Sequence, residues 1–311
     1  MKLLVTGGLG FIGSNFILHA LKKYPDFKIT NIDAGLIGSN KKNLAEIKKG
    51  TNYQFVRGNI SNKQTVDRLV KKCDCIINFA AESHVDRSIS GPKPFLDSNV
   101  MGLQVLLESI RKFNKKLIQI STDEVFGSLK KGSAKEDDPF DPASPYAASK
   151  AAAEMLAKSY VKTYGCDIMI TRCTNNYGPR QFEEKLIPKV ILFAKQNKKI
   201  PVYGNGKNIR DWIYVDDHCE ALFKILFNGK KGESYNISAS NELSNLVIIK
   251  KILRIMNKPT NLIKFVPDRL GHDFRYSLDS SKTRKRLRWI PKVNFDTGLE
   301  NTIKWYLDRK W

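Results

Sequence analysis

Short apolar runs alternate with longer amphipathic stretches along the first half of the chain. Six runs are almost continuously apolar, as expected of parallel strands that are covered on both faces. They predict strands over residues 3–6, 28–33, 53–57, 75–79, 117–121 and 168–172. Apolar residues at helical spacing predict helices over residues 14–23, 99–113 and 144–164. This alternation predicts an α/β fold with a Rossmann-type, doubly wound parallel sheet.

The pattern loosens after about residue 175. Segments interrupted by Gly and Pro replace the regular alternation, which favours a smaller lobe built from loops and short elements. We therefore expect a nucleotide-binding domain over residues 1–175. Residues 176–311 should mainly form a C-terminal substrate-binding lobe, interleaved with the first domain because no sharp boundary separates them.

The composition is that of a globular protein. The chain has 311 residues, of which 41% are hydrophobic and 27% charged, and no apolar run approaches the roughly 18 residues that span a bilayer. We expect no membrane segment and no cleavable leader, because the first strand starts at residue 3. The cysteines form no disulfide framework, which favours reduced thiols and a cytoplasmic location. They are Cys73, Cys75, Cys166, Cys173 and Cys219.

The formal net charge is +22, from 53 Lys and Arg against 31 Asp and Glu. Such an excess attracts phosphorylated or polyanionic ligands through long-range electrostatics. The lysines are mostly scattered pairs, and the one dense basic run covers residues 282–288. Because no groove-reading motif accompanies this charge, a lysine-rich solvated surface is favoured and a nucleic-acid partner is not expected.

A glycine-rich turn follows the first predicted strand. Gly7, Gly10 and Gly13 stand at the GxxGxxG spacing before a predicted helix. Glycines there permit close approach of a pyrophosphate to the helix N-terminus, whose free N–H groups favour anions. Asp33 ends the second strand, where a carboxylate accepts hydrogen bonds from an adenosine ribose and disfavours a 2′-phosphate. The order of these elements predicts a dinucleotide site that prefers NAD to NADP.

Two further motifs carry side chains suited to proton transfer. Tyr146 and Lys150 form a YxxxK pair on one face of a predicted helix, so the ammonium could lower the pKa of the phenol and let it act as a base. Thr122, Asp123 and Glu124 end a parallel strand at the sheet edge where ligands bind. Alcohol oxidation needs one base, whereas an additional acid and base suit a further step such as elimination of water.

Taken together, these motifs resemble the sugar-nucleotide dehydratases of the extended short-chain dehydrogenase/reductase family, specifically the dTDP-glucose 4,6-dehydratases. The resemblance runs almost end to end. The segments that carry it are TGGLGFIGSNF (6–16), FAAESHVDRSI (79–89), STDEVFG (121–127), PYAASKAAAE (145–154), NNYGPRQFEEKLIP (175–188), YGNGKNIRDWIYVDDH (203–218) and DRLGHDFRY (268–276).

The resemblance implies conversion of dTDP-glucose to its 4-keto-6-deoxy form by a lyase that uses bound NAD. Tyr146 would take the proton from the sugar O4 as hydride leaves C4, with Thr122 hydrogen-bonding near O4. Glu124 would then remove the C5 proton while Asp123 protonates the departing O6 hydroxyl, and hydride would return to C6. The cofactor would be regenerated in each turnover and must therefore stay bound.

The resemblance also implies the residues that surround each ligand. Besides the glycines, Asp33, Tyr146 and Lys150, the cofactor would contact Phe11, Ile12, Asn59, Ile60, Ala80, Ala81, Ser98 and Asn176. The sugar nucleotide would contact Thr122, Ser83, Asn175, Lys185, Leu186, Pro201, Tyr203, Arg210, Asn245, Arg269 and His272. Guanidinium groups such as those of Arg210 and Arg269 suit a diphosphate. Because the histidines lack a third ligand at metal spacing, we expect no metal.

Three positions depart from the family pattern. Phe126 and Asn59 replace a usual Tyr and Asp, outside the proposed acid and base groups, and put loop packing and cofactor affinity in question. Arg180 is a difference expected close to the nucleotide end of the substrate. It leaves the base open between thymine and uracil.

Other functions remain open from the sequence. A UDP-glucose 4,6-dehydratase, or an NAD-dependent sugar-nucleotide 4-epimerase or decarboxylase, would use the same NAD, Tyr and Lys core. Epimerases need no second acid and base, so Asp123 and Glu124 favour dehydration. A nucleotide-regulated or nucleic-acid-binding protein would have no need of these groups. We also expect a homodimer built on the helices over residues 99–113 and 144–164, because the Ala-rich face of the second offers little bulk for a monomer core but suits close helix packing.

Overall fold

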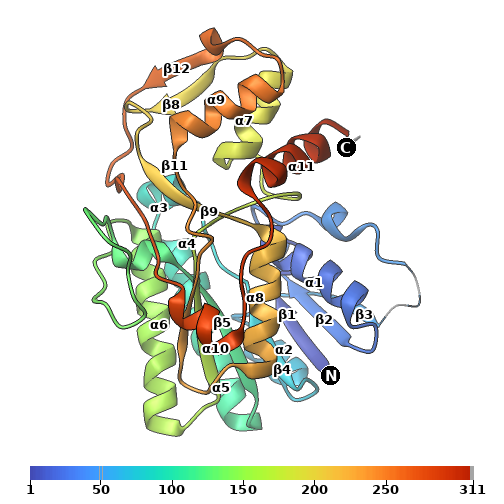
Figure 1. The fold of residues 1–311 in the computed structure, drawn as a ribbon. Coiled ribbons are helices and arrows are strands. Elements are labelled where there is room, and N and C mark those ends of the chain that lie inside the picture. The colour runs from blue at the N-terminus through green and yellow to red at the C-terminus, as the bar shows by residue number, and fades with distance from the viewer. Residues whose placement is uncertain (49, 51, 309–311) are drawn as a thin grey trace.

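A parallel seven-stranded sheet forms the centre of the protein (Figure 1). The structure is a computed structural model, and it describes residues 1–48, 50 and 52–308. The strands lie in the order β10-β6-β5-β4-β1-β2-β3, and each neighbouring pair is parallel. Their bounds are β1 Lys2–Thr6, β2 Lys28–Asp33, β3 Tyr53–Arg57, β4 Cys75–Asn78, β5 Lys116–Thr122, β6 Ile168–Cys173 and β10 Ser234–Ile237.

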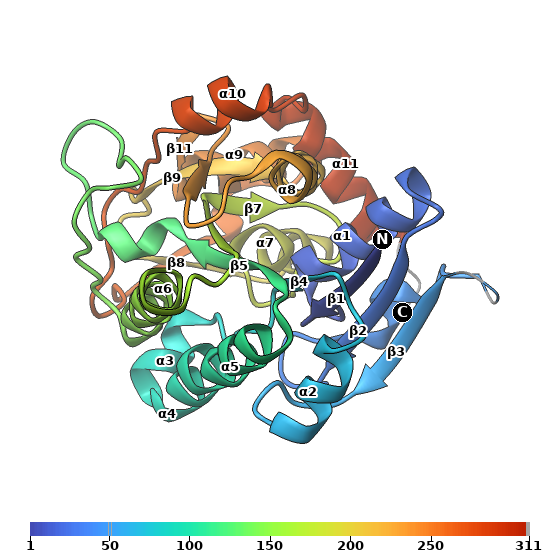
Figure 2. The ribbon, with the colours of Figure 1, turned by 90° about the horizontal axis from the view of Figure 1, so that it is seen from below.

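Helices cover both faces of this sheet (Figure 2). Because side chains alternate along a strand, Leu3 and Val5 of β1 join a core with helices α1 and α8, whereas Leu4 joins a second core with α2, α5 and α6. The strands can therefore be apolar on both sides. The helix bounds are α1 Phe11–Lys23, α2 Lys63–Val70, α5 Leu103–Phe113, α6 Pro145–Tyr164 and α8 Val215–Asn228.

The predicted α/β doubly wound sheet is confirmed. Each predicted strand is present with ends within one residue of the expected bounds. The predicted helix over residues 99–113 begins differently, since a π-helical segment at Asp97–Gly102 precedes α5. The seventh strand, β10, was not predicted from the sequence, and it comes from the C-terminal part of the chain.

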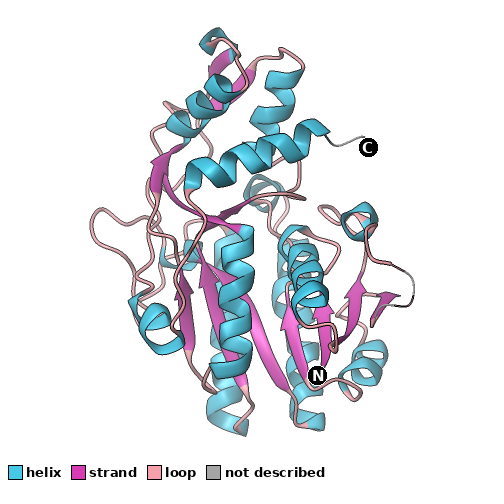
Figure 3. Cartoon of the chain, turned by 45° about the vertical axis from the view of Figure 1, so that its right-hand side comes forward, coloured by secondary structure: helices cyan, strands magenta, loops and turns pink. Residues whose placement is uncertain are grey.

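Most of the remaining elements form a smaller layer above the carboxyl edge of the sheet (Figure 3), whereas α10, Ser281–Leu287, packs beside the large sheet against β10 and α8. A three-stranded sheet β11-β9-β7 and a parallel pair β12-β8 enclose a separate apolar core with α7, α9 and α11. The chain enters this part after β6 and returns to the large sheet through α8 and β10. The bounds are β7 Asn175–Tyr177, α7 Leu186–Lys195, β8 Ile200–Tyr203, β9 Ile209–Tyr214, β11 Glu242–Ser244, α9 Asn245–Ile255, β12 Ile263–Val266, α10 Ser281–Leu287 and α11 Phe295–Asp308; short helices α3 Val85–Ser90 and α4 Lys93–Leu96 precede α5.

The alanines of α6 lie on two faces, which corrects the reason given for a dimer. Ala153 and Ala157 pack in the core beneath the sheet, so they do supply packing within the monomer. Ala148 and Ala152 are exposed and share the outer face of α6 with Met155, whose exposed fraction is 57%. This outer face of α6 therefore offers apolar surface to a partner.

Candidate active site

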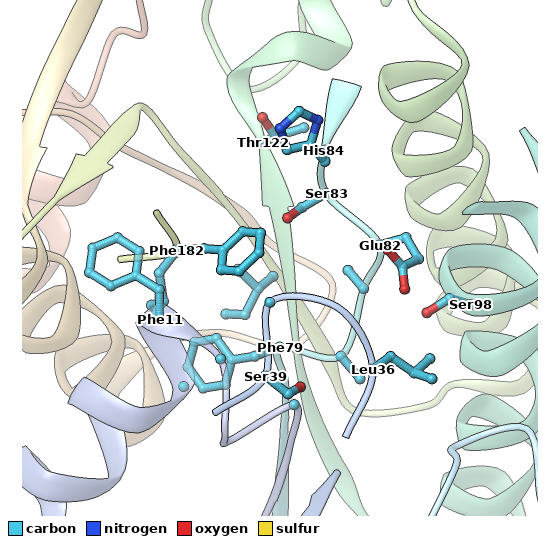
Figure 4. A pocket seen from close by; sticks show the side chains of 18 of the residues that line it. Phe11, Leu36, Ser39, Phe79, Glu82, Ser83, His84, Ser98, Thr122 and Phe182 are labelled. Carbon is cyan, nitrogen blue, oxygen red and sulfur yellow. The ribbon is translucent and has the colours of Figure 1, made fainter. Parts of the chain in front are cut away.

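A cavity of about 320 Å³ lies at the carboxyl edge of the large sheet. It runs from the glycine-rich turn after β1 to the end of β5 and the first turn of α6. Figure 4 shows Phe11, Phe79 and Phe182 on one side of it, with Glu82, Ser83 and Ser98 approaching from the other. Parallel α/β sheets commonly bind ligands at this edge.

The glycine-rich turn is packed too closely for side chains. A Cβ atom on Gly7 would lie 2.6 Å from the backbone nitrogen of Ala80, and one on Gly13 would lie 2.6 Å from the carbonyl oxygen of Gly7. Gly7 also has a φ of +68°, a left-handed conformation that glycine adopts readily. The turn therefore presents bare backbone to the cavity just before α1 begins at Phe11.

Asp33 connects this turn to the loop that follows β2. Its Oδ2 accepts a hydrogen bond from the backbone N–H of Leu9 at 2.9 Å. Its Oδ1 accepts from the backbone N–H of Gly35 and from the hydroxyl of Ser39, both at 2.8 Å. The carboxylate is buried and lines the cavity, so it is held in one orientation at this end.

Tyr146 and Lys150 lie one turn apart on α6, and both are buried. The Nζ of Lys150 donates to the backbone carbonyl of Ile120 at 2.6 Å, and burial lowers the pKa of Lys150 to about 8. Burial, with the Glu124 carboxylate nearby, raises the pKa of Tyr146 well above its usual range. This contradicts the predicted lowering of the Tyr146 pKa by Lys150, because desolvation and a neighbouring anion outweigh the ammonium here.

Asp123 and Glu124 follow β5 in a short 3₁₀ helix, Asp123–Phe126, which Thr122 caps. The hydroxyl of Thr122 donates to Asp123 Oδ1 at 3.1 Å, and Asp123 Oδ2 has no hydrogen-bond partner among the described residues. Burial, and then the Glu124 charge, raise the pKa of Asp123 well above its usual range.

Burial also raises the pKa of Glu124, while Arg269, Lys185 and Arg210 act to lower it. The two carboxyl groups thus lie in different environments: three cations oppose the effect of burial at Glu124, whereas at Asp123 the neighbouring Glu124 charge adds to it. This is the division expected of an acid and a base.

The cations around the cavity are placed differently from one another. Lys185 lines the cavity and donates to the carbonyl of Ser83 at 2.9 Å. Arg210, on β9, uses its guanidinium on the carbonyls of Ile209, Asp273 and Phe274 and lies over the Tyr276 ring at 4.2 Å. The guanidinium N–H groups of Arg210 therefore mostly bind backbone carbonyls of the protein itself.

The part of the chain that the structure describes holds no group of three or more His, Cys, Asp or Glu residues arranged to bind a metal. Within the same residues no helix has the length and apolar character needed to cross a bilayer. All five cysteines are buried free thiols.

Comparison with known proteins identifies the family. The model of the GDP-mannose 4,6 dehydratase family matches residues 4–302. The chain belongs to this family. It is 48% identical over 99% of both chains to the low-salt glycan biosynthesis protein Agl12 of Haloferax volcanii, and 45% identical to a dTDP-glucose 4,6-dehydratase of Streptomyces niveus over all of this chain and 94% of the relative.

A solved structure of a similar protein has the same fold. The dTDP-glucose 4,6-dehydratase DesIV of Streptomyces venezuelae, crystallised with NAD bound, superimposes with a TM-score of 0.97 at 41% identity. The alignment covers 100% of this chain and 98% of that one. The resemblance drawn from the motifs is therefore confirmed at the level of the family and of the fold.

The cavity collects every residue predicted for the cofactor. These are Gly7, Gly10, Phe11, Ile12, Gly13, Asp33, Asn59, Ile60, Ala80, Ala81, Ser98, Tyr146, Lys150 and Asn176. Four of the residues predicted for the substrate also line it, namely Ser83, Thr122, Asn175 and Lys185. The others lie outside its lining, and their roles stay predictions; they are Leu186, Pro201, Tyr203, Arg210, Asn245, Arg269 and His272.

Several lining residues were missed by the sequence analysis. Phe79, Phe182 and Gln181 line the cavity, as does Glu82, whose pKa is raised by burial. Phe79 and Glu82 lie in the segment FAAESHVDRSI, directly after β4, so their position at a strand end was the available signal. Phe182 and Gln181 follow an irregular turn after β7, and no local pattern in the sequence places them.

The three departures from the family pattern have distinct structural settings. Phe126 packs edge-on against Phe140 and beneath the Arg172 guanidinium, away from the cavity. Asn59 lines the cavity and accepts a hydrogen bond from the backbone N–H of Ser61. Arg180 lies outside the cavity lining, where its guanidinium binds Asn15, Asn43 and Glu46, and its expected place near the nucleotide end of the substrate stays a prediction.

Proposed function

We propose that this protein is an NAD-dependent dTDP-glucose 4,6-dehydratase. The observation that carries the proposal is the pair Asp123 and Glu124, held in different environments beside Tyr146 and Lys150. An epimerase requires no second acid and base at this place. Full-length relatives named dTDP-glucose 4,6-dehydratase, at 41–45% identity, support the same substrate.

NAD is the cofactor that the cavity fits. The glycine-rich turn offers bare backbone N–H groups at the start of α1, which suits a pyrophosphate, and Asp33 suits the hydroxyls of an adenosine ribose. The relative DesIV was crystallised with NAD. When bound, NAD supplies a reversible hydride acceptor and, in its oxidised form, a positive charge that favours an ionised phenol.

The chain's own residues handle the protons. Tyr146 accepts the proton of the sugar O4, and Thr122 orients that hydroxyl. Once C4 is a ketone, the C5 proton is acidic and Glu124 removes it. Asp123, whose pKa burial raises, donates a proton to the departing O6 hydroxyl, so water leaves across C5 and C6. Return of the hydride taken from C4 to C6, together with return of a proton to C5, completes a 4-keto-6-deoxy sugar without net oxidation.

The substrate is an anionic sugar nucleotide, and Lys185 and Arg269 are the cations proposed to hold its diphosphate. The Nε atom of Arg269 is buried without a partner among the described residues, and Asp86 lies 3.5 Å from its Nη1. Arg269 can thus exchange a carboxylate for a phosphate. Arg210 contributes a positive field and anchors the loop of Asp273 and Phe274.

We also propose a homodimer in the cytoplasm. The π-helical segment Asp97–Gly102 exposes Met101, and the outer face of α6 exposes Met155 beside the small residues Ala148 and Ala152; the exposed fractions of the two methionines are 56% and 57%. Apolar surface of this kind suits helix packing between two copies. Light scattering should give twice the chain mass, and a monomer at all concentrations would refute the dimer. The buried free thiols suit a reducing compartment.

A product assay tests the proposed function. The purified protein is incubated separately with dTDP-glucose and UDP-glucose, and the 4-keto product is followed in each. We expect product from dTDP-glucose without an added reductant. Turnover of UDP-glucose alone would transfer the assignment to a UDP-glucose dehydratase. Formation of a C4 epimer with no loss of water would replace dehydration by epimerisation.

A further inference from the structure

Arg180 joins three segments that surround the Asp33 end of the cavity. It follows β7, and its side chain is 17% exposed. Its Nε donates to the backbone carbonyl of Asn43 at 3.0 Å, its Nη1 donates to Asn15 Oδ1 at 3.0 Å, and its Nη2 binds Glu46. The guanidinium also lies over the Trp305 ring, 5.9 Å from its centre.

The first contact reaches the glycine-rich turn through Asn43. The side-chain amide of Asn43, 5% exposed, donates to the carbonyl of Leu9 at 2.9 Å. Leu9 in turn donates its N–H to Asp33. A continuous series of hydrogen bonds therefore runs from Arg180 through Asn43 and Leu9 to Asp33, which lines the cavity.

The second contact reaches the start of α1. Asn15 accepts from Arg180 and uses its amide nitrogen on the carbonyls of Phe11 and Pro179, at 2.9 and 3.0 Å. Phe11 is the first residue of α1 and lines the cavity. Arg180 thus braces the glycine-rich turn from outside at Leu9 and at Phe11, where α1 begins.

The same guanidinium fixes the loop that covers Asp33. Residues 34 and 36–39 line the cavity, and the short helix Lys41–Leu44 follows them directly. Arg180 binds this helix at the carbonyl of Asn43 and the next turn at Glu46. Gly35 and Gly38 have φ values of +72° and +88° with open space around them. The loop is otherwise held by its own bonds to Asp33 and by the N–H of Asn40, which donates to the carbonyl of Leu9 at 3.0 Å. Arg180 adds a restraint from outside the loop.

We propose that Arg180 is a positioning residue that retains NAD by bracing the glycine-rich turn and the loop over Asp33. The inference rests on the proposed function, in which one NAD serves many turnovers and must not escape between oxidation at C4 and reduction at C6. Arg180 touches neither the reacting atoms nor the cavity. Its effect is therefore on the affinity for the dinucleotide and not on the chemical steps.

Direct binding of NAD tests this inference without reference to dehydratase activity. NAD is titrated into the unmodified protein and into Arg180→Ala by calorimetry, and the bound NAD per chain is measured after gel filtration. Losing charge-assisted hydrogen bonds that order this end of the site should raise the Kd for NAD about tenfold or more. The KM for NAD should rise with it, while kcat at saturating NAD stays within about twofold.

A double-mutant cycle tests the path through Asn43. Asn43→Ala removes the bond to Leu9 and should weaken NAD binding to a similar degree. If both residues act through one chain of hydrogen bonds, the fold-increase in the Kd for NAD in the double variant should be smaller than the product of the fold-increases in the two single variants. Full additivity would overturn the path through Asn43.

Arg275 provides a matched control. Its side chain is 16% exposed and, like that of Arg180, binds one carboxylate and one backbone carbonyl, those of Glu242 and Gly132. Arg275→Ala should lower the melting temperature as much as Arg180→Ala yet leave the Kd for NAD unchanged. Equal weakening of NAD in both variants, or an unchanged Kd in Arg180→Ala, would overturn the proposal. Failure of the unmodified protein to bind NAD would instead overturn the proposed function.

Discussion

The two ends of the cavity differ in whether their buried polar atoms have hydrogen-bond partners. At the Asp33 end, both carboxylate oxygens already accept hydrogen bonds from the turn and the loop around them. At the Tyr146 end, buried polar atoms lack partners among the residues that the structure describes: Ser121 Oγ, Asp123 Oδ2, Thr174 Oγ1 and Asn175 Oδ1. A buried polar atom without a partner costs about 1–3 kcal/mol.

This difference indicates that the Asp33 end is a rigid binding frame for the cofactor, whereas the Tyr146 end is the reactive site. The Asp33 end is ordered by backbone groups and by the brace at Arg180, so its shape exists before any ligand arrives. The Tyr146 end keeps acceptors and donors unused, and burial shifts the pKa values of Tyr146, Asp123 and Lys150. Perturbed titratable groups of this kind gather at functional sites. Substitutions at the two ends should therefore fail in different ways.

The largest effect is expected from Tyr146→Phe. This variant keeps the ring and its packing against Phe95 but removes the oxygen that accepts the O4 proton. Oxidation at C4 should fall by about 10²–10⁴-fold or more, with no NADH absorbance in a single turnover. NAD affinity should change little. Normal appearance of NADH in this variant would remove Tyr146 from the mechanism.

The two carboxylates should fail at later stages. Glu124→Gln should still oxidise C4 and accumulate enzyme-bound NADH, but it should lose deuterium incorporation at C5 from heavy water. Asp123→Asn should also permit oxidation, yet slow the loss of water by about 10²–10⁴-fold, as expected for one general acid. Single-turnover absorbance with mass spectrometry separates these stages. Normal turnover in both variants would favour the epimerase function.

How far the sequence predicted each region follows from how each is built. The strands, the glycine-rich turn and Asp33 were predicted because continuous apolar runs and local spacing determine them. The features that the sequence did not predict depend on contacts between distant segments. Strand β10 joins the large sheet beside β6, and Arg180 binds residues more than 130 positions away. The pKa of Tyr146 was predicted in the wrong direction because spacing on a helix indicates a neighbour but not burial.

Asp33→Asn tests the frame. An amide would place N–H groups against the donors of Leu9 or Gly35, which now both point at the carboxylate. The Kd for NAD should rise about tenfold or more, and rejection of NADP should relax, because the charge that opposes a 2′-phosphate is gone. Calorimetry with both dinucleotides measures this, with the exposed Asp26→Asn as control. An unchanged preference for NAD would locate the discrimination elsewhere.

Stability should respond to Asp123 and Asp67 with opposite signs. Burial raises the pKa of Asp123, so the folded state holds its proton where the unfolded state has lost it, and the free energy of unfolding falls as pH rises above about 4. Bonds from Ser109 and Lys112 lower the pKa of Asp67, whose stabilisation is present above about pH 4 and lost in acid.

Thermal melts of two variants check these signs. At pH 7, Asp123→Asn should melt higher by about 2 °C or more, while Asp67→Asn should melt lower. Both differences should shrink toward pH 3. A lower melting temperature for Asp123→Asn at neutral pH would show that its carboxylate stabilises the fold, and the proposed acid would lose its physical basis.

The smallest effect is expected from salt. Its effect on the kinetics distinguishes the contribution of the exposed surface charge from that of the cations that line the cavity. Salt screens exposed lysines over a distance of about 10 Å at 0.1 M, whereas Lys185 is half-buried in the cavity near Glu124 and is screened less. The +22 surface should therefore speed capture of the anionic sugar nucleotide without changing the reaction. Raising the salt concentration from 0.05 to 0.5 M should lower kcat/KM several-fold and leave kcat nearly constant. An equal fall in kcat would mean that salt also screens the charges at the Tyr146 end of the cavity. Tight, sequence-dependent DNA binding at physiological salt would instead indicate that the basic surface binds a nucleic acid.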